Sequence, residues 1–347
     1  MKKWMALLLA VLLLVPIMLH AYAEGNTRVF VDSSGREVVL PEKIERIAVT
    51  GPLAQIVVFA AAPDHFVALS NEWNEGSEDF IDEKYLNLPV LGQLYGGKGQ
   101  MNLEELLAAA PQVVIDVGRP VEGVREDMDA LTAQTGIPFV HIQAHTGSME
   151  KTYAMLGELL GMEEEAAALS AYCEKAYARA KAISESVDKA RVLYIPGITG
   201  LSVIAQNSYH SEVIDMMGDN LAVMENPSSR GTGNEVSMEQ IMLWNPDAVI
   251  FGERGGYEEA LSDPLWQTVS AGQNGRMYLA PFGVNNWMGN PPSVQRLLGM
   301  LWMGKLLYPE AADYDMYEEA AQYYDLFYHC DLTREQYDAL VADSLGK

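Results

Sequence analysis

Two shortages narrow the classes of protein that this sequence can encode. Its 347 residues include only two cysteines, Cys173 and Cys330, too few for a disulfide-rich scaffold or a four-cysteine zinc site. The sequence leaves open whether these two form a disulfide. Basic residues are also scarce, with 23 Lys and Arg against 48 Asp and Glu. Because nucleic acids and anionic membrane surfaces repel so acidic a chain, we expect neither as a partner.

Sequence motifs of common enzyme classes are missing as well. There is no G-x-S-x-G nucleophile elbow, no phosphate-binding loop with its lysine and no H-E-x-x-H zinc motif. A bare metal site would need three or four ligands, and no carboxylate cluster supplies them. We therefore expect no enzyme, no catalytic residue, no metal centre and no resident cofactor. The alternative from another class is an exported hydrolase, for which Ser208 near His210 is the one local hint.

The long apolar run of the sequence lies at its N-terminus. Lys2 and Lys3 precede the apolar residues 4–19, and the small residues Ala21 and Ala23 follow. Basic, apolar and small residues in this order are typical of a secretory signal peptide. The apolar run is also shorter than the ~20 residues of a membrane-spanning helix. We expect residues 1–23 to be a signal peptide cleaved after Ala23, and the protein to be periplasmic or extracellular. A retained membrane anchor is the alternative.

The rest of the chain divides into four parts. Residues 24–162 alternate short apolar runs with helical patterns, as expected of an α/β lobe around a parallel sheet. Residues 163–188 are predicted to form one long connecting helix, separated by Gly161 from the helix before it. The alternation resumes in residues 189–291, a second α/β lobe, and residues 292–347 are predicted to be C-terminal helices.

These patterns predict an α/β fold with two Rossmann-like lobes joined by one long α-helix. Ligands of open α/β sheets bind outside the carboxyl ends of the strands, so we expect a ligand cleft between the lobes. The predicted strands are 46–49, 66–69, 90–91, 113–116, 139–142, 192–195, 202–205, 248–251 and 277–280.

An internal repeat supports two equivalent lobes. Residues 102–115 read NLEELLAAAPQVVI and residues 237–250 read SMEQIMLWNPDAVI. Each copy begins with a helix N-cap residue, Asn102 or Ser237, and has Glu or Gln three positions later. A proline and an apolar strand end each copy. The alternative is that any capped helix before a strand looks like this.

Several segments resemble the class III substrate-binding proteins of ABC transporters, which serve iron–siderophore, haem, cobalamin and some molybdate or tungstate uptake systems. The first is VFVDSSGREVVLPEKIERIAVTGP, and the repeat lies in two others, LPVLGQLYGGKGQMNLEELLAAAPQVVI and NEVSMEQIMLWNPDAVIFG. DPLWQTVSAGQNGRMYLAPFG follows them, and the C-terminal LLGMLWMGKLLYPE and YYDLFYHCDLTREQYDAL are similar to the iron and oxyanion branches. The likeness covers nearly all of residues 28–345.

This resemblance implies an exported receptor that captures an iron chelate, a siderophore or haem, and delivers it to a membrane permease. Molybdate or tungstate, and cobalamin, are the alternative ligands of the same fold. The implied partners are a small-molecule ligand and an ABC permease dimer, and the receptor itself is expected to be a monomer.

The candidates for the ligand site are side chains in the loops that follow the predicted strands. Arginine can clamp a carboxylate or an oxyanion, aromatic rings can pack on a flat chelate, and histidine can bind a metal. Core packing and solvated loops are the alternative explanations. The candidate ligand-binding residues are Trp73, Tyr95, Arg119, His145, Tyr209, His210, Arg230, Arg254, Asn286 and Trp287.

Glu104 and Glu239 are candidates for docking to the permease. Both take the second helical position of their copy of the repeat. A helix N-terminus favours an acid there, which is the alternative explanation for each one. Equivalent lobes would place the two acids on one face, as a two-fold symmetric permease requires. In the resembling cobalamin-binding protein the matching acids pair with permease arginines, so the resemblance implies the same role here.

Overall fold

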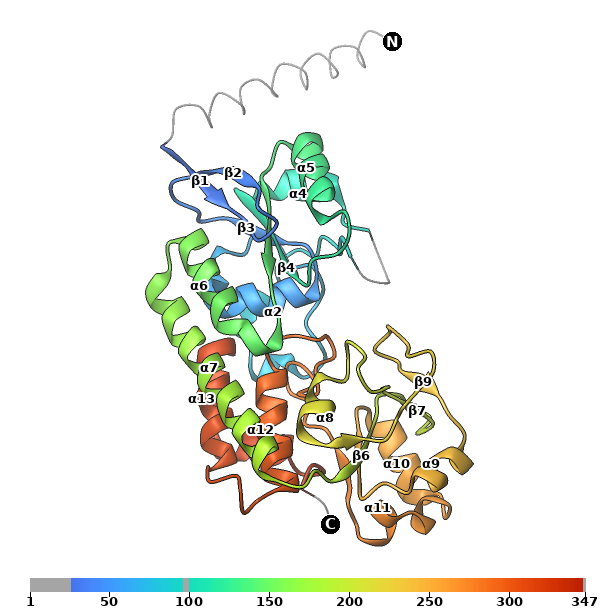
Figure 1. Ribbon diagram of the computed structural model, residues 1–347. Coiled ribbons are helices and arrows are strands. Elements are labelled where there is room, and N and C mark those ends of the chain that lie inside the picture. Colours follow the sequence, from blue (N-terminus) through green and yellow to red (C-terminus); the bar gives the residue numbers. More distant parts are fainter. Residues whose placement is uncertain (1–25, 96–99, 346–347) are drawn as a thin grey trace.

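The structure is a computed structural model, and it describes residues 26–95 and 100–345 of the chain. The expected signal peptide, residues 1–23, lies outside this range. Within the range, no helix combines the length and the apolar character that crossing a membrane requires. Figure 1 shows an upper and a lower lobe, with long helices running along one side of both.

The N-terminal lobe is built on a parallel sheet of three strands in the order β3 (Ile47–Val49), β4 (Val113–Gly118) and β5 (Phe139–Gln143). All of β3 and all but the last residue of β4 are buried, so both faces of the sheet need a cover. Two helices pack on each face. They are α2 (Pro52–Ala61) and α6 (Met149–Leu160) on one, and α4 (Leu103–Ala109) and α5 (Val124–Thr135) on the other.

The first lobe departs from the prediction in two places. The predicted strands at 66–69 and 90–91 form only isolated bridges, Ile47 with Phe66 and Leu69 with Val90. An antiparallel hairpin of β1 (Thr27–Val31) and β2 (Glu37–Pro41) precedes the sheet and was not predicted. The short elements of this lobe are η1 (Pro63–His65), η2 (Ser77–Asp79), α3 (Glu83–Leu86) and η3 (Thr146–Ser148).

The C-terminal lobe has a four-stranded parallel sheet in the order β11-β10-β6-β8. A two-stranded antiparallel ladder, β7 with β9, lies beside it. The strands are β6 (Arg191–Ile195), β7 (Ser202–Val203), β8 (Asp219–Asn220), β9 (Asn234–Glu235), β10 (Ala248–Phe251) and β11 (Met277–Leu279). The helices of this lobe are α8 (Glu212–Met217), α9 (Met238–Trp244), α10 (Arg254–Ser262), η4 (Trp266–Thr268) and α11 (Ser270–Gln273).

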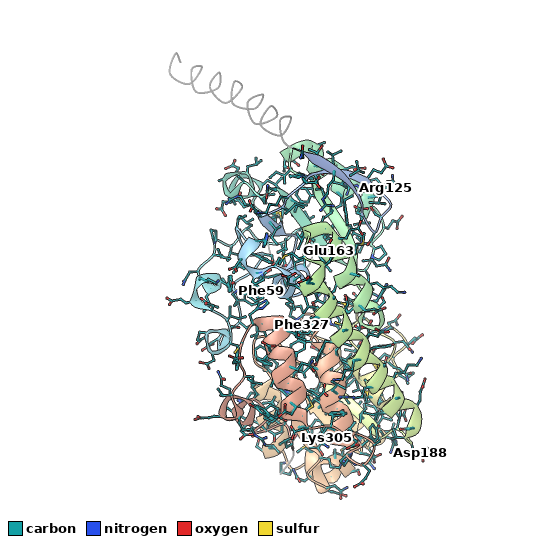
Figure 2. All side chains as sticks on the ribbon, turned by 90° about the vertical axis from the view of Figure 1, so that its left-hand side faces the viewer. Phe59, Arg125, Glu163, Asp188, Lys305 and Phe327 are labelled. Atoms are coloured by element: carbon teal, nitrogen blue, oxygen red, sulfur yellow. The ribbon has the colours of Figure 1, made fainter. Side chains whose placement is uncertain are left out.

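One long helix, α7 (Glu163–Ser186), connects the lobes. Its 24 residues span about 36 Å at 1.5 Å per residue. Gly161 adopts a left-handed conformation, φ 67°, and ends the preceding helix α6 as the sequence predicts. Figure 2 shows α7 descending from Glu163 in the upper lobe past Phe327 to the lower lobe.

The first two C-terminal helices pack against α7, and the hydrophobic cluster that they share with it contains residues of both lobes. The core contains the ring of Phe327 stacked on Tyr323, with ring centroids 4.4 Å apart, and the buried Tyr172 of α7 at the edge of both. Cys173 is buried beside them, and it and Cys330 are both free thiols. The C-terminal helices are α12 (Arg296–Leu307), α13 (Met316–Tyr328) and α14 (Arg334–Leu340).

Candidate functional site

A cavity of about 350 Å³ lies between the lobes, at the carboxyl ends of β3 and β4. The first lobe contributes residues 50–54 and 116–119, and the second lobe contributes Tyr209. Pro291 and Pro292, which precede α12, complete the lining. We call this cavity the interlobe cleft. Its position is the one expected for ligand binding to two facing α/β sheets.

The N-terminus of α2 faces the interlobe cleft. The N-cap residue Gly51 has no side chain to accept a hydrogen bond, and Pro52 takes the first helical position. The amide groups of Leu53 and Ala54 in the first turn therefore receive no side-chain cap. A helix end of this kind carries partial positive charge and favours an anion.

Arg119 crosses the interlobe cleft. It comes directly after β4, and its guanidinium lies 3.7 Å from the centre of the Tyr209 ring of the other lobe. Arg119 is exposed, whereas burial raises the pKa of the Tyr209 hydroxyl and keeps that group neutral. A guanidinium stacked on an aromatic ring keeps its N–H donors free at the edge, so it can still bind an anion.

An ion pair between the buried Arg296 and the half-buried Glu212 supports Tyr209 from below. Arg296 donates to the Tyr209 carbonyl at 2.6 Å and to the Glu212 carboxylate at 2.6 Å, and its guanidinium lies 5.1 Å from the Tyr209 ring. The Thr146 hydroxyl of the first lobe also donates to Glu212. Burial lowers the pKa of Arg296, and the carboxylate of Glu212 opposes that effect. Arg296 was not predicted, because it lies in an apolar helix with no charged neighbour in sequence.

His210 lies next to Tyr209 and is neutral. Its ring centroid is 5.4 Å from that of Tyr209. Burial lowers the pKa of His210, and so do the positive charges of Arg296 and Arg119. A hydrogen bond with the backbone of Ser229 opposes this effect by raising the pKa. Ser208 Oγ is buried without a hydrogen-bond partner among the described residues, so it lacks the bond to His210 that an activated nucleophile needs.

The loop that carries Arg230 packs against His210. A Cβ at Gly231 would lie 3.2 Å from Cε1 of His210, so the loop backbone approaches the ring closely. Arg230 itself is exposed, and its backbone N–H donates to Ser228 Oγ at 3.1 Å. His145 is half-buried and lines a small space below Tyr209, beside Glu212.

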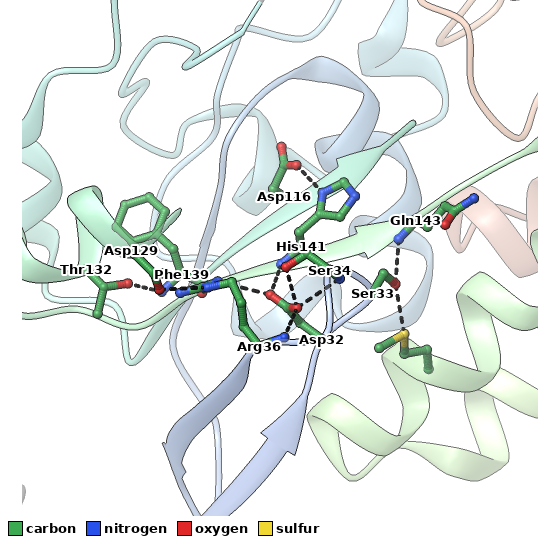
Figure 3. Close-up of polar contacts among 11 residues, drawn as sticks. Asp32, Ser33, Ser34, Arg36, Asp116, Asp129, Thr132, Phe139, His141 and Gln143 are labelled. Atoms are coloured by element: carbon green, nitrogen blue, oxygen red, sulfur yellow. Dashed lines mark hydrogen bonds and ion pairs between the residues drawn. The ribbon is translucent and has the colours of Figure 1, made fainter. Parts of the chain in front are cut away.

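A row of polar side chains crosses the sheet of the first lobe, and two of them, Thr50 and Asp116, line the interlobe cleft. Thr50 directly follows β3 and lies beside Asp116 of β4, since Val49 pairs with Ile115, and Asp116 pairs in register with His141 of β5. The Thr50 hydroxyl donates to one oxygen of Asp116, and Nδ1 of His141 lies 2.6 Å from the other. Figure 3 shows the contact between His141 and Asp116, and it shows Asp32, which accepts from the backbone N–H of His141. None of the three was among the predicted ligand-binding residues.

Two aromatic candidates lie at the sides of the interlobe cleft. Tyr95 lines it directly, and its hydroxyl donates to Asp127 of α5 at 2.9 Å. Trp73 lines a neighbouring space of about 190 Å³, with its indole N–H 3.3 Å from the carbonyl of Tyr85. Pro52 and Pro291 line both spaces, so the two are neighbours.

The structure corrects two predicted site residues. Trp287 is 1% exposed and belongs to the hydrophobic core, so the expectation that it faces the cleft is wrong. Asn286 is also buried, and its amide is used within the fold. It donates to the Gly252 carbonyl at 3.0 Å and accepts from the backbone of Met288 at 2.8 Å. A polar sequence after a strand could not reveal that the chain turns inward there.

Arg254 occupies a different hollow from Arg119. It lines a groove of about 660 Å³ at the carboxyl ends of β10 and β11, with Phe282 and Glu253. Asp343 accepts from its guanidinium at 2.9 Å, and Glu258 lies 3.7 Å away. These carboxylates neutralise Arg254, which makes the smaller interlobe cleft the stronger candidate for an anion. No three His, Cys, Asp or Glu side chains of the described residues gather where they could hold a metal ion.

Comparison with known proteins identifies the fold and the family. The sequence profile of the periplasmic binding protein family matches residues 68–283. An ABC transporter solute-binding protein of Sulfurospirillum deleyianum is 27% identical, with a TM-score of 0.82 over 91% of this chain and 99% of its own. A periplasmic solute-binding protein of Veillonella parvula is also 27% identical, with a TM-score of 0.77 over 91% of this chain and 97% of its own.

More distant structures share the fold alone. The molybdate-binding protein MolA of Haemophilus influenzae is 20% identical, with a TM-score of 0.67 over 88% of this chain and 99% of its own. No match was found among curated protein sequences.

The family match covers more than half of the chain. The chain therefore belongs to the periplasmic binding protein family, as a class III solute-binding receptor of an ABC transporter.

Proposed function

We propose that this receptor captures an anionic iron chelate, a siderophore or haem, in the interlobe cleft. The observation that carries the proposal is the stacking of Arg119 on Tyr209 beside the uncapped N-terminus of α2. This arrangement offers positive charge and a flat aromatic surface at the same place. An anionic chelate can interact with both. Its charged outer groups bind to the positive charge, and its planar ligands pack on the aromatic surface.

The size of the cleft supports an organic ligand. Its volume of about 350 Å³ falls in the range of small-molecule sites, about 300–1,000 Å³. The neighbouring space, which Trp73 lines, has an aromatic wall. Both are larger than a tetrahedral oxyanion needs.

Molybdate or tungstate is the second candidate. The N-terminus of α2 and the guanidinium of Arg119 together form the kind of donor set that binds small oxyanions. The H. influenzae protein with the same fold binds molybdate. At 20% identity this likeness shows the fold alone, so the choice between the two ligands depends on the volume and the aromatic lining.

Direct binding measurements distinguish these ligands. Mature receptor is titrated with a ferric catecholate siderophore, haem, molybdate and cyanocobalamin, while tryptophan fluorescence and the melting temperature are recorded. We expect a ferric siderophore or haem to quench the fluorescence, because Trp73 lies beside the cleft, and to raise the melting temperature. If these leave both signals unchanged and molybdate raises the melting temperature, the oxyanion is the ligand. Native mass spectrometry with metal analysis of protein from its own source identifies the bound species.

We also propose that Glu104 and Glu239 dock the receptor on its permease dimer. Both side chains are exposed, and each lies in the first turn of a seven-residue helix, α4 or α9. Hydrogen bonds with its own backbone N–H and with Ser237 lower the pKa of Glu239 and keep it ionised. Glu104→Arg and Glu239→Arg should reduce permease binding and uptake, and leave ligand affinity and melting temperature near wild type. Normal uptake by both variants would contradict the assignment.

A further inference from the structure

The two helices of the repeat expose large apolar side chains to water. Leu107 of α4 is 48% exposed. On α9, Met242 is 40% exposed and Leu243 is 77% exposed. Each helix already buries one apolar residue at its centre, Leu106 or Ile241. Packing within the receptor therefore does not account for the exposed ones.

The exposed residues occupy equivalent positions in the two lobes. Leu107 in the first copy of the repeat aligns with Met242 in the second, and each follows its acid, Glu104 or Glu239, by three residues. Residues three apart on a helix lie on one face. Each lobe thus presents an acid and an apolar side chain together.

In both lobes an arginine at the start of a strand donates hydrogen bonds to the C-terminal end of the repeat helix. Arg46, just before β3, donates to the carbonyls of Ala109 and Ala110 at the end of α4. Arg191, at the start of β6, donates to the carbonyls of Trp244 and Asn245 at the end of α9. The guanidinium caps the helix C-terminus in each case.

The residues that end α4 and α9 repeat as well. Ala110 and Asn245 both adopt the left-handed conformation, with φ 47° and 44°. The N-caps Asn102 and Ser237 both accept hydrogen bonds from the first turn. Short helices fixed at both ends present their side chains in a defined orientation, which favours recognition by a rigid partner.

We infer that each lobe docks to its partner through a surface that combines an acid with an apolar side chain one helical turn later. We call these two surfaces the docking faces. They comprise Glu104 with Leu107 and Glu239 with Met242 and Leu243. The partner is a two-fold symmetric membrane protein that offers each face a basic group beside an apolar pocket. This inference rests on the proposed docking to a permease dimer and adds the apolar half of the contact.

The observations favour this occupant over two others. An anionic lipid surface would be repelled by the net charge of −25. A second copy of the receptor would bring like-charged acids together. A pair of equivalent faces on two lobes matches a partner that repeats its own binding surface by two-fold symmetry.

The test measures binding of mature receptor to inner-membrane vesicles from its source organism, at low and at high salt. We compare Leu107→Ser, Met242→Ser and Leu243→Ser with Glu104→Gln and Glu239→Gln. Val39→Ser is the matched control, because Val39 is 62% exposed on the β1–β2 hairpin, outside both docking faces. Melting temperatures confirm that each variant is folded, and light scattering records the oligomeric state.

We expect Leu107→Ser, Met242→Ser and Leu243→Ser each to weaken binding about tenfold at both salt concentrations, since burying one large apolar side chain is worth about 1.5 kcal/mol. The Glu variants should lose most of their affinity at low salt and show little further salt dependence. Val39→Ser should bind like wild type.

The outcomes separate this inference from the proposed function. If the apolar variants bind normally and the Glu variants do not, the acids dock and the inference is wrong. If the apolar variants bind weakly and the Glu variants bind normally, the apolar contact stands and the proposed role of the acids is wrong. A change in oligomeric state on replacing Leu107 or Leu243 would assign the faces to contacts between receptors and overturn the inference.

Discussion

The guanidinium of Arg119 stacks on the ring of Tyr209, although the two residues belong to different lobes. Arg119 is held by the end of β4, and Tyr209 is held by its carbonyl, which accepts from the buried Arg296. In this contact Arg119 is the exposed side chain that can adjust its position, and Tyr209 is the one that is held in place. A ligand that enters the interlobe cleft meets both at once, and this makes the pair the part of the site most sensitive to ligand charge.

Replacing Arg119 should weaken ligand binding without unfolding the protein. Arg119→Met keeps the length of the side chain and removes its charge. We expect affinity for an anionic ligand to fall about 10- to 100-fold, because a hydrogen bond to a charged group is worth about 1.5–3 kcal/mol. The melting temperature should stay near wild type, since Arg119 is exposed. Isothermal titration calorimetry measures the affinity.

Arg125→Met is the matched control, because Arg125 is an exposed arginine on α5. It should bind ligand like wild type. Equal losses for the two variants would indicate a general effect of the receptor's charge and contradict a specific role for Arg119.

Breaking the ion pair below Tyr209 should destabilise the fold. Glu212→Gln leaves the buried guanidinium of Arg296, whose side chain is 2% exposed, without its counter-charge. We expect a loss of about 3 kcal/mol in the free energy of unfolding, measured by urea denaturation. Arg296→Met combined with Glu212→Gln should lose less than the sum of the single changes, because the two residues form one unit. Strict additivity would show that the pair is not coupled.

Local sequence signals predicted the parts of the fold that depend on short-range patterns. Gly161 ends α6, and both repeat helices begin at the predicted caps. The buried strand β10 has the predicted bounds, Ala248–Phe251. The strand expected at 66–69 failed because its neighbours pair with it at single positions only. A run of apolar residues indicates that a segment is buried. Whether the segment forms a strand also depends on the strand that lies beside it.

The site was predicted less completely than the fold. Arg119 and Tyr209 were predicted as ligand-binding residues because they follow strands, and both line the interlobe cleft. The position of Trp287 was predicted wrongly. The loop that carries it turns into the protein, so that Trp287 lies in the hydrophobic core and not in the cleft. Asp116 was taken as the last residue of a strand, and its contacts with Thr50 and His141 come from the register of three strands. Register between distant segments leaves no local mark in the sequence.

Gly289 should tolerate no side chain. It has φ 92°, and a Cβ there would collide with Nε of the buried Arg296. We expect Gly289→Ala to lower the melting temperature and to weaken ligand binding, because Arg296 supports Tyr209. Gly123→Ala is the control: Gly123 has a similar φ of 85°, but nothing lies within 4 Å of its Cβ. The control isolates the backbone strain of about 1–2 kcal/mol, and a similar loss in both variants would show that the collision with Arg296 costs nothing.

The protonation of His210 should couple ligand binding to pH. Burial and the charges of Arg296 and Arg119 lower the pKa of His210 below its usual value of 6.5. The unfolded chain therefore binds this proton more readily than the folded one. The stability due to neutral His210 is present above about pH 6.5 and is lost as the pH falls through the lowered pKa. An anionic ligand beside the ring would favour the charged form and raise that pKa again.

We therefore expect the affinity for an anionic ligand to increase as the pH falls from about 7.5 to about 5.5, with uptake of a proton on binding. Isothermal titration calorimetry in two buffers of different ionisation enthalpy measures that uptake directly. In His210→Gln the uptake should vanish and the affinity should change little with pH, because glutamine stays neutral. The same variant should also lose less stability than wild type over this pH range. If His210→Gln takes up as much proton as wild type, another group in the interlobe cleft carries the coupling.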